Sequence, residues 1–157
     1  SSWRGSLAAA ECCHFPYPVP WTTELTGYAI YVILRRETPM AWIIETYRDA
    51  RGNLPVDDFI RSLPPKGRGR VYWTLELLKE FGLQLSMPYT RPLRGKLWEL
   101  RIRSGRSAYR ILYFAFTGQR FVLLHGFRKK SRKTPQREFQ IAERRMADYV
   151  TRAKGRE

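Results

Sequence analysis

The stretch Leu97-Trp-Glu-Leu-Arg-Ile-Arg103 predicts the type of fold more clearly than any other part of the sequence. Apolar and charged side chains alternate along it with a period of two, as in a β-strand that buries one face. The apolar face holds Trp98, Leu100 and Ile102, and the opposite face holds Glu99, Arg101 and Arg103. We therefore expect a strand with one buried face and one charged face.

Two more strands are predicted directly after this one. Residues 104–107 form a glycine-containing turn, and residues 108–116 form a longer and more buried strand. Residues 117–119 (Thr-Gly-Gln) make a tight connection to a third strand, 120–127. Three consecutive strands joined by short turns predict an antiparallel meander.

The segments before the meander predict one strand and two helices. Residues 41–48 are rich in β-forming side chains and predict a first strand. A short helix is expected over 55–63, with a proline and acidic residues in its first turn. A second helix is expected over about 66–81, where apolar residues recur at helical spacing and Gly82 follows as a C-cap. A proline-containing loop then runs over 83–92.

The segment after the meander predicts a last helix. Thr134 and Pro135 have the character of an N-cap and a first helical residue, and the helix is expected to run to about Arg152. Its apolar stripe consists of Phe139, Ala142, Met146 and Tyr149. The predicted fold class is α+β, in the order β-α-α-β-β-β-α, with a small antiparallel sheet and helices packed on it.

Positive charge is concentrated in one part of the chain. The 157 residues carry a formal net charge of +15, and 26 basic and 11 acidic residues lie in 40–157. Residues 1–39 hold three of each, and we expect them to be a neutral appendage (a leader, a cloning remnant or upstream sequence) before a domain over 40–157. The alternative is a genuine extension in which residues 28–34 add an edge strand. The excess of cations indicates a polyanionic partner, most often nucleic acid.

Composition and motifs exclude several other classes. A hydrophobic fraction of 43% and an aromatic fraction of 14% are enough to build a core, which excludes disorder throughout. No apolar run reaches the roughly 18 residues that a membrane span requires, so we expect a cytoplasmic protein with no membrane partner. Adjacent cysteines in Cys12-Cys13-His14 cannot both bind one metal comfortably. With no paired-carboxylate or nucleotide-binding motif, we expect neither a metal nor a cofactor.

Cations lie on the predicted strands and in the loop after the last strand. The candidate phosphate-binding residues are Arg101, Arg103, Arg110, Arg128, Lys129, Lys130, Arg132 and Lys133. Tyr109 and Tyr113 offer planes for base stacking. Strict alternation puts these tyrosines on the opposite face from Arg110, so a bulge or a strand end is needed to bring them together. The alternative is a set of solvated charges on an open sheet face.

Such a basic surface can cleave RNA without a metal. The RNA 2′-hydroxyl attacks the adjacent phosphate while arginine and lysine stabilise the charge that develops. His125 is the natural candidate for proton transfer by its pKa, with Tyr109 and Tyr113 as further candidates. Alternation groups His125 with Phe121, Leu123 and Phe127, which favours a partly buried, structural histidine instead.

Three ordered segments together resemble the phage-derived HigB-like proteins, a branch of the RelE/ParE toxin superfamily. They are Leu93-Arg-Gly-Lys-Leu-Trp-Glu-Leu-Arg-Ile-Arg103, Ala108-Tyr-Arg-Ile-Leu-Tyr113 and Val122-Leu-Leu-His-Gly-Phe-Arg-Lys-Lys-Ser-Arg-Lys-Thr-Pro135. The likeness covers about residues 40–152. It implies a RelE-like fold and a type II toxin that cleaves mRNA in the ribosomal A site. It also implies a cognate helix-turn-helix antitoxin as a partner.

The resemblance also implies roles for individual residues. The basic positions of RelE-type toxins fall on Arg101 and Arg103 in the second strand, on Arg110 in the third, and on Lys130 after the fourth, with Lys129 beside it. A tyrosine near the C-terminus is often catalytic in the superfamily, but Tyr149 lies too far along the last helix to match securely.

Two alternatives to a ribosome-dependent endonuclease remain open from the sequence. A non-catalytic nucleic-acid-binding module explains the charge equally well, but not the spacing of the three segments. A ParE-like gyrase poison on the same fold predicts DNA damage without mRNA cleavage.

Overall fold

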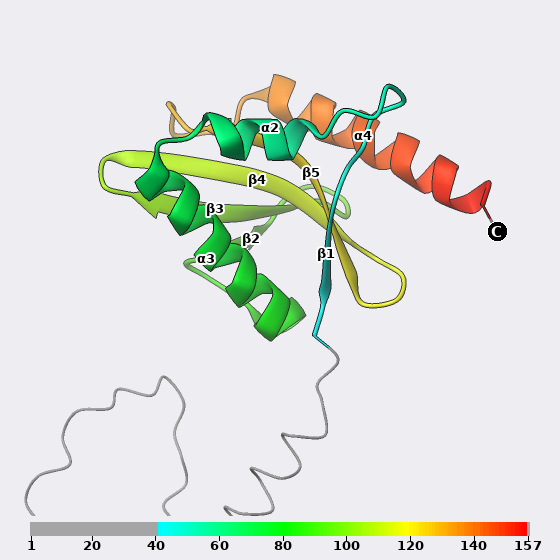
Figure 1. The fold of residues 1–157 in the computed structure, drawn as a ribbon, viewed down its shortest axis with the longest axis horizontal. Helices are drawn as coiled ribbons and strands as arrows, with labels where there is room; N and C mark the ends of the chain where they lie inside the picture. The colour runs from blue at the N-terminus through cyan, green and yellow to red at the C-terminus, as the bar shows by residue number, and fades with distance from the viewer. Residues whose placement is uncertain (1–40, 157) are drawn as a thin grey trace, which may run out of the picture. The chain divides into compact units, whose positions relative to one another are not determined.

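The computed structural model describes residues 41–156, which form a five-stranded sheet and three α-helices (Figure 1). The strands are β1 (Ile43–Thr46), β2 (Thr90–Pro92), β3 (Trp98–Ser104), β4 (Ser107–Phe116) and β5 (Arg120–Arg128). The helices are α2 (Pro55–Ser62), α3 (Pro65–Phe81) and α4 (Gln136–Lys154), together with the short 3₁₀ helix η1 (Gly82–Gln84). The predicted α+β class is confirmed, and β2 is an additional strand inside the predicted loop.

Some predictions fall on residues that the structure does not describe. The neutral appendage over 1–39, the alternative edge strand over 28–34 and the Cys12-Cys13-His14 group all lie outside the described residues. Within the described part of the chain, no helix combines the length and the apolar character needed to cross a membrane.

The strand order is β1-β5-β4-β3-β2. Strands β3, β4 and β5 form the predicted antiparallel meander, and β2 adds to β3 in antiparallel orientation. Strand β1 pairs with β5 in parallel, so the sheet is mixed and is antiparallel only over the strands β2 to β5. The parallel pairing is possible because the chain leaves β1 through two helices, a connection long enough for a crossover.

Helices cover both faces of the sheet, and each face has its own core (Figure 1). Helices α2 and α3 bury Val56, Ile60, Val71 and Leu78 against one face, as expected from their apolar spacing. Helix α4 packs Ala142, Phe139 and Met146 against the other face. Burial on both faces explains why the middle of β4 is a continuous apolar run rather than an alternating one.

A β-bulge changes which side chains of β5 face which helix. Leu112 lies opposite His125, whereas Tyr113 lies opposite Leu123, so Leu124 is the extra residue of β5. The bulge reverses the alternation beyond it. Phe121 and Leu123 therefore face α2 and α3, while Phe127 joins the core under α4. The predicted grouping of His125 and Phe127 with Phe121 and Leu123 is wrong for this reason.

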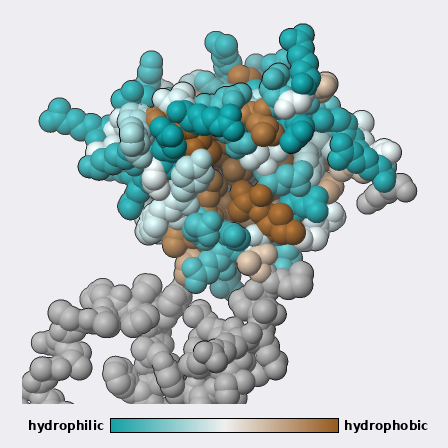
Figure 2. Space-filling model, viewed as in Figure 1, coloured by the Kyte–Doolittle hydropathy of each residue, from teal (hydrophilic) through white to brown (hydrophobic). Residues whose placement is uncertain are grey.

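Long hydrophilic side chains cover most of the visible surface, with hydrophobic atoms gathered near its middle (Figure 2). The large apolar side chains that the described residues expose are Ile43, Tyr72, Trp73, Leu83 and Met87. Two of them touch cations: the Arg70 guanidinium lies 4.3 Å from the Trp73 ring centre, and Arg101 Nη1 lies 3.5 Å from Met87 Sδ.

Gly82, at the end of α3, is a position where only glycine fits. Its φ of +56° lies in the left-handed region, and a Cβ added there would lie 2.0 Å from Nε1 of Trp42. The Trp42 ring is itself stacked on Phe121 at 4.3 Å between ring centres. A larger residue at this position would therefore disturb the contact between α3 and the sheet.

We predict that Gly82→Ala lowers the free energy of unfolding by at least about 2 kcal/mol, through backbone strain and displacement of Trp42. Urea denaturation measures this loss. Gly118→Ala is the matched control, because φ is also positive (+75°) but a Cβ there would meet no atom within 4 Å. Equal destabilisation by both variants would contradict the role of the Trp42 contact.

Candidate nucleic-acid interface

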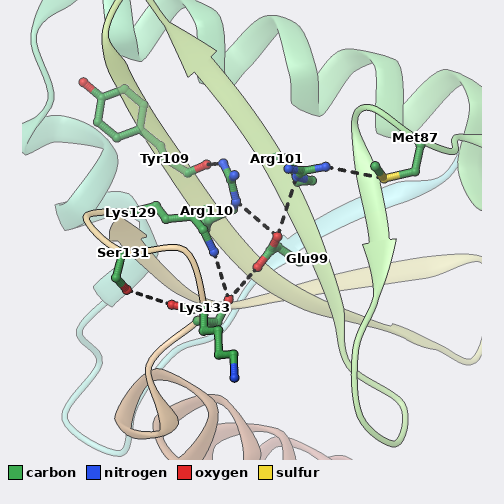
Figure 3. A network of polar contacts seen from close by, with 9 residues as sticks. Met87, Glu99, Arg101, Tyr109, Arg110, Lys129, Ser131 and Lys133 are labelled. Carbon is green, nitrogen blue, oxygen red and sulfur yellow. Dashed lines mark hydrogen bonds and ion pairs between the residues drawn. The ribbon is translucent and has the colours of Figure 1, made fainter.

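A buried carboxylate lies at the centre of the basic surface. The Glu99 residue is 2% exposed and Arg110 is 4% exposed. Arg110 Nε donates a hydrogen bond to Glu99 Oε1 at 3.1 Å, and the Thr134 hydroxyl donates to Glu99 Oε2 at 2.9 Å (Figure 3). Both carboxylate oxygens are thus engaged, which is the condition under which a charged side chain is tolerated in a protein interior.

The pairing of β3 with β4 explains why a carboxylate is needed here. Arg101 and Arg110 are directly opposite each other, so their side chains share a face of the sheet. Two such cations repel each other. Glu99 Oε1 lies 3.1 Å from Arg110 Nε and 3.8 Å from Arg101 Nε, which compensates both charges. The alternation placed Glu99 on this face correctly, but its central role was not predicted. The signal in the sequence was that the charged face of this strand carries one acidic residue, Glu99, beside Arg101 and Arg103.

Lys129 joins this network from the end of β5. Its backbone N–H donates to the Ala108 carbonyl at 2.8 Å. Its Nζ lies 3.4 Å from the Thr134 hydroxyl. Partial burial lowers the pKa of Lys129, as do Arg110 and Arg101, whereas Glu99 raises it. A lysine with a lowered pKa gives up its proton more readily, which suits proton transfer.

Thr134 connects the network to the start of α4 and corrects one prediction. The helix starts at Gln136, Pro135 occupies the N-cap position, and no side chain caps it by a hydrogen bond. The Thr134 hydroxyl donates to Glu99 instead of capping the helix, so its predicted role as the N-cap is wrong. The physical reason is that the buried Glu99 carboxylate competes for the Thr134 hydroxyl.

The remaining predicted cations are exposed around the network. They are Arg103, Arg128, Lys130, Arg132 and Lys133. Arg128 reaches across to donate to the Ser107 hydroxyl at 2.8 Å, and Arg101, one-third exposed, bridges the network and the surface. The structure therefore brings together Arg101, Arg110 and Lys129, whereas the others are surface charges beside them.

Arg110 lies opposite Arg101 on the predicted face, but it is buried there. Its guanidinium donates to Glu99 and, through Nη1, to the Tyr109 carbonyl at 2.8 Å. Burial lowers the pKa of Arg110, and the neighbouring Glu99 opposes this shift. Arg110 is only 4% exposed, so it is not available to bind a phosphate. Its ion pair holds the Glu99 carboxylate in position beside Arg101.

The two predicted stacking tyrosines are buried on the other face. Tyr109 and Tyr113 are each 3% exposed, and both belong to the core under α2 and α3. The Tyr109 ring packs edge-on against Phe59 and points away from the network in Figure 3. Burial strongly raises the pKa of Tyr113. The β-bulge lies beyond Tyr109 and does not turn it toward the cations, so neither ring offers a face to a base.

His125 is held by α4. Its Nε2 is in hydrogen-bonding contact with the Glu138 carboxylate, and Arg145 Nη1 lies 3.1 Å from Nδ1. Since arginine is always a donor, Nδ1 accepts and the neutral ring donates from Nε2. The ring also stacks on Phe127. These contacts give His125 a structural role at the interface between β5 and α4.

Tyr149 likewise belongs to the core under α4. Its ring packs against Phe114 at 5.9 Å and against Phe116 at 5.3 Å between ring centres. Phe116 pairs with Arg120, at the opposite end of β4 from Arg110. Tyr149 therefore does not approach the Glu99 network.

Comparison of the sequence with protein families gives a match over most of the described domain. The family described as phage derived protein Gp49-like (DUF891) matches residues 58–147. The chain belongs to this family. The matched segment runs from within α2 to within α4 and contains every residue of the Glu99 network. A search of curated proteins found no match. The Gp49-like family is associated with toxins of the RelE/HigB type.

We predict that Glu99→Gln destabilises this Gp49-like protein by about 3 kcal/mol, because the Arg110 charge stays buried without its counterion. Chemical denaturation measures the change. Glu143→Gln is the control: it breaks the exposed ion pair with Arg94 at 3.4 Å and should cost less than about 1 kcal/mol. Similar losses of unfolding free energy in the two variants would contradict the role of Glu99 as a buried counterion.

A second prediction concerns pH. Burial lowers the pKa of His125 below 6.5 in the fold, although Glu138 opposes the shift. The unfolded chain then binds a proton at His125 more readily than the folded chain. The stabilisation that neutral His125 gives the fold is therefore present above about pH 6.5 and is lost as the pH falls below it. We expect His125→Gln to flatten the fall in unfolding free energy between about pH 7 and pH 5. An unchanged slope would refute this assignment.

Proposed function

We propose that this protein is the toxin of a type II toxin-antitoxin system and an endoribonuclease that cleaves mRNA on the ribosome. The observation that carries the proposal is the Glu99 network, which holds Arg101 through Glu99 and Lys129 through Thr134 in a Gp49-like chain. The association of that family with RelE/HigB-type toxins supports a toxin, and the excess of cations supports an RNA substrate.

The chemistry proposed for this face needs no metal. The RNA 2′-hydroxyl attacks the adjacent phosphorus and gives its proton to solvent water. The bond from phosphorus to the 5′-oxygen breaks, which leaves a 2′,3′-cyclic phosphate and a 5′-hydroxyl. Arg101 and Arg103 stabilise the negative charge on the phosphate oxygens. Lys129, with its lowered pKa, donates a proton to the departing 5′-oxygen. Glu99 positions Arg101 by an ion pair and Thr134 by a hydrogen bond. Arg110 in turn holds Glu99.

The proposed partners follow from this activity. The ribosome and its bound mRNA supply the RNA backbones that the exposed cations contact, Lys130, Arg132 and Lys133 among them. A cognate helix-turn-helix antitoxin neutralises the toxin, and both act in the cytoplasm. The main competing function is a nucleic-acid-binding module without activity, since His125 and both candidate tyrosines are engaged elsewhere in the fold.

We predict that the double variant Arg101→Ala/Arg103→Ala abolishes growth arrest on induction and removes the discrete mRNA cleavages that the wild-type protein produces. Neither side chain is buried, so the fold should be retained. Primer extension on mRNA from induced cells measures cleavage, and circular dichroism checks the fold. Arg94→Ala is the matched control, because Arg94 is an exposed cation that pairs with Glu143 on α4.

Three outcomes are decisive. Full toxicity of the double variant would overturn the assignment of Arg101 and Arg103. RNA binding by the wild type without any cleavage would favour the binding module. DNA damage without mRNA cleavage would favour a gyrase poison.

A further inference from the structure

A second basic feature lies beside the Glu99 network and takes no part in it. An open depression of about 440 Å³ lies between the first half of α3 and the turn that joins β3 to β4. The cations that line it are Lys66, Arg70 and Arg103. Trp73 also lines it, and none of its described lining residues is acidic.

Trp73 is exposed although large aromatic residues are usually buried. The residue is 43% exposed, yet its ring is held in place by two contacts. Arg70, one helical turn earlier, lies over the ring at 4.3 Å from its centre. Tyr89 packs edge-on against it at 5.8 Å between ring centres. A fixed, exposed indole beside cations is typical of a surface on which a base stacks.

The depression adjoins the candidate active site. Strand β2 pairs only with residues Trp98–Leu100 of β3, and the Arg101 N–H donates to the Tyr89 carbonyl at 2.7 Å. In the described part of the chain, no strand covers this side of β3 beyond that point. Arg103 lies on this open edge, two residues from Arg101, and lines the depression as well. A single strand of RNA that leaves Arg101 can therefore reach Trp73 along the edge.

We propose that the depression binds one nucleotide of single-stranded RNA, with its base stacked on the Arg70–Trp73 pair and its flanking phosphates held by Lys66 and Arg103. Guanidinium and indole planes both stack on bases, and the stacking tolerates any base. The proposal rests on the proposed function for the choice of RNA. It extends that function by a base contact at Trp73, and Arg103 is shared between this depression and the proposed cleavage site. An acidic protein segment would satisfy the cations but would make no use of the stacked indole.

The experiment separates base stacking from charge attraction. The probes are a short fluorescein-labelled oligoadenylate and an abasic oligonucleotide of the same length, and fluorescence anisotropy with the full chain measures their affinity. We expect Trp73→Ala to weaken oligoadenylate binding about tenfold and to leave binding of the abasic probe unchanged. Trp73→Phe keeps an aromatic plane and should retain most of the affinity. Arg70→Gln should weaken both probes and reduce the salt dependence by about one counterion.

Tyr72→Ala is the matched control, because Tyr72 is an exposed aromatic on the same helix that does not line the depression. It should leave both affinities unchanged, and thermal unfolding should show that all variants fold. Equal loss on both probes in Trp73→Ala, or no loss on either, would overturn the proposal. Binding of polyglutamate that depends on Trp73, without a base-dependent loss, would also overturn it and indicate a protein partner.

This assay uses no ribosome, so its result is independent of cleavage. If the wild type does not cleave mRNA but shows the base-dependent loss, the proposed function fails and the nucleotide site stands. If the wild type cleaves mRNA and Trp73→Ala shows no such loss, the nucleotide site fails and the proposed function stands.

Discussion

The buried ion pair between Glu99 and Arg110 is the interaction on which the basic face depends. Cross-strand pairing of β3 with β4 forces Arg101 and Arg110 to the same side of the sheet, and α4 begins directly beside them. One carboxylate compensates both guanidinium groups and also accepts the Thr134 hydroxyl bond. Because an unpaired charge in this interior is costly, strand, loop and helix start must keep their relative positions. The network is therefore both a structural element and the support of the proposed phosphate site.

The two-layered core makes this arrangement rigid. Helices α2 and α3 cover one face of the sheet, and helix α4 covers the other. A one-residue shift in strand register would move apolar side chains off both cores, so the register of the central strands is fixed. The β-bulge at Leu112 and Tyr113 turns His125 toward α4, where Glu138 and Arg145 hold it. His125 is therefore used for packing, and the exposed part of the proposed interface is made of arginine and lysine. The Trp73 depression extends that surface around the open edge of β3.

Local sequence patterns predicted most of the helices and strands, but not every pairing between strands. The alternation over β3, the apolar spacing of α3 and the C-cap at Gly82 depend on residues close in sequence, so they could be recognised directly. The parallel pairing of β1 with β5 and the short strand β2 depend on partners far along the chain. For the site, the strand pattern indicated that Arg101 and Arg110 share a face, but it did not indicate that Arg110, Tyr109 and Tyr113 are buried.

The sequence by itself determined the α+β class, the meander, the concentration of charge after residue 39 and the candidate cations. These follow from periodicity and composition, which are properties of neighbouring residues. Only the tertiary structure decided which cations are buried and which are free. Arg110 and Arg101 look alike in the sequence, but one pairs with Glu99 in the interior and the other reaches the surface. The tertiary structure also decided that His125 contacts α4 and that Trp73 and Arg103 line one depression. Both depend on elements that come together only when the chain folds.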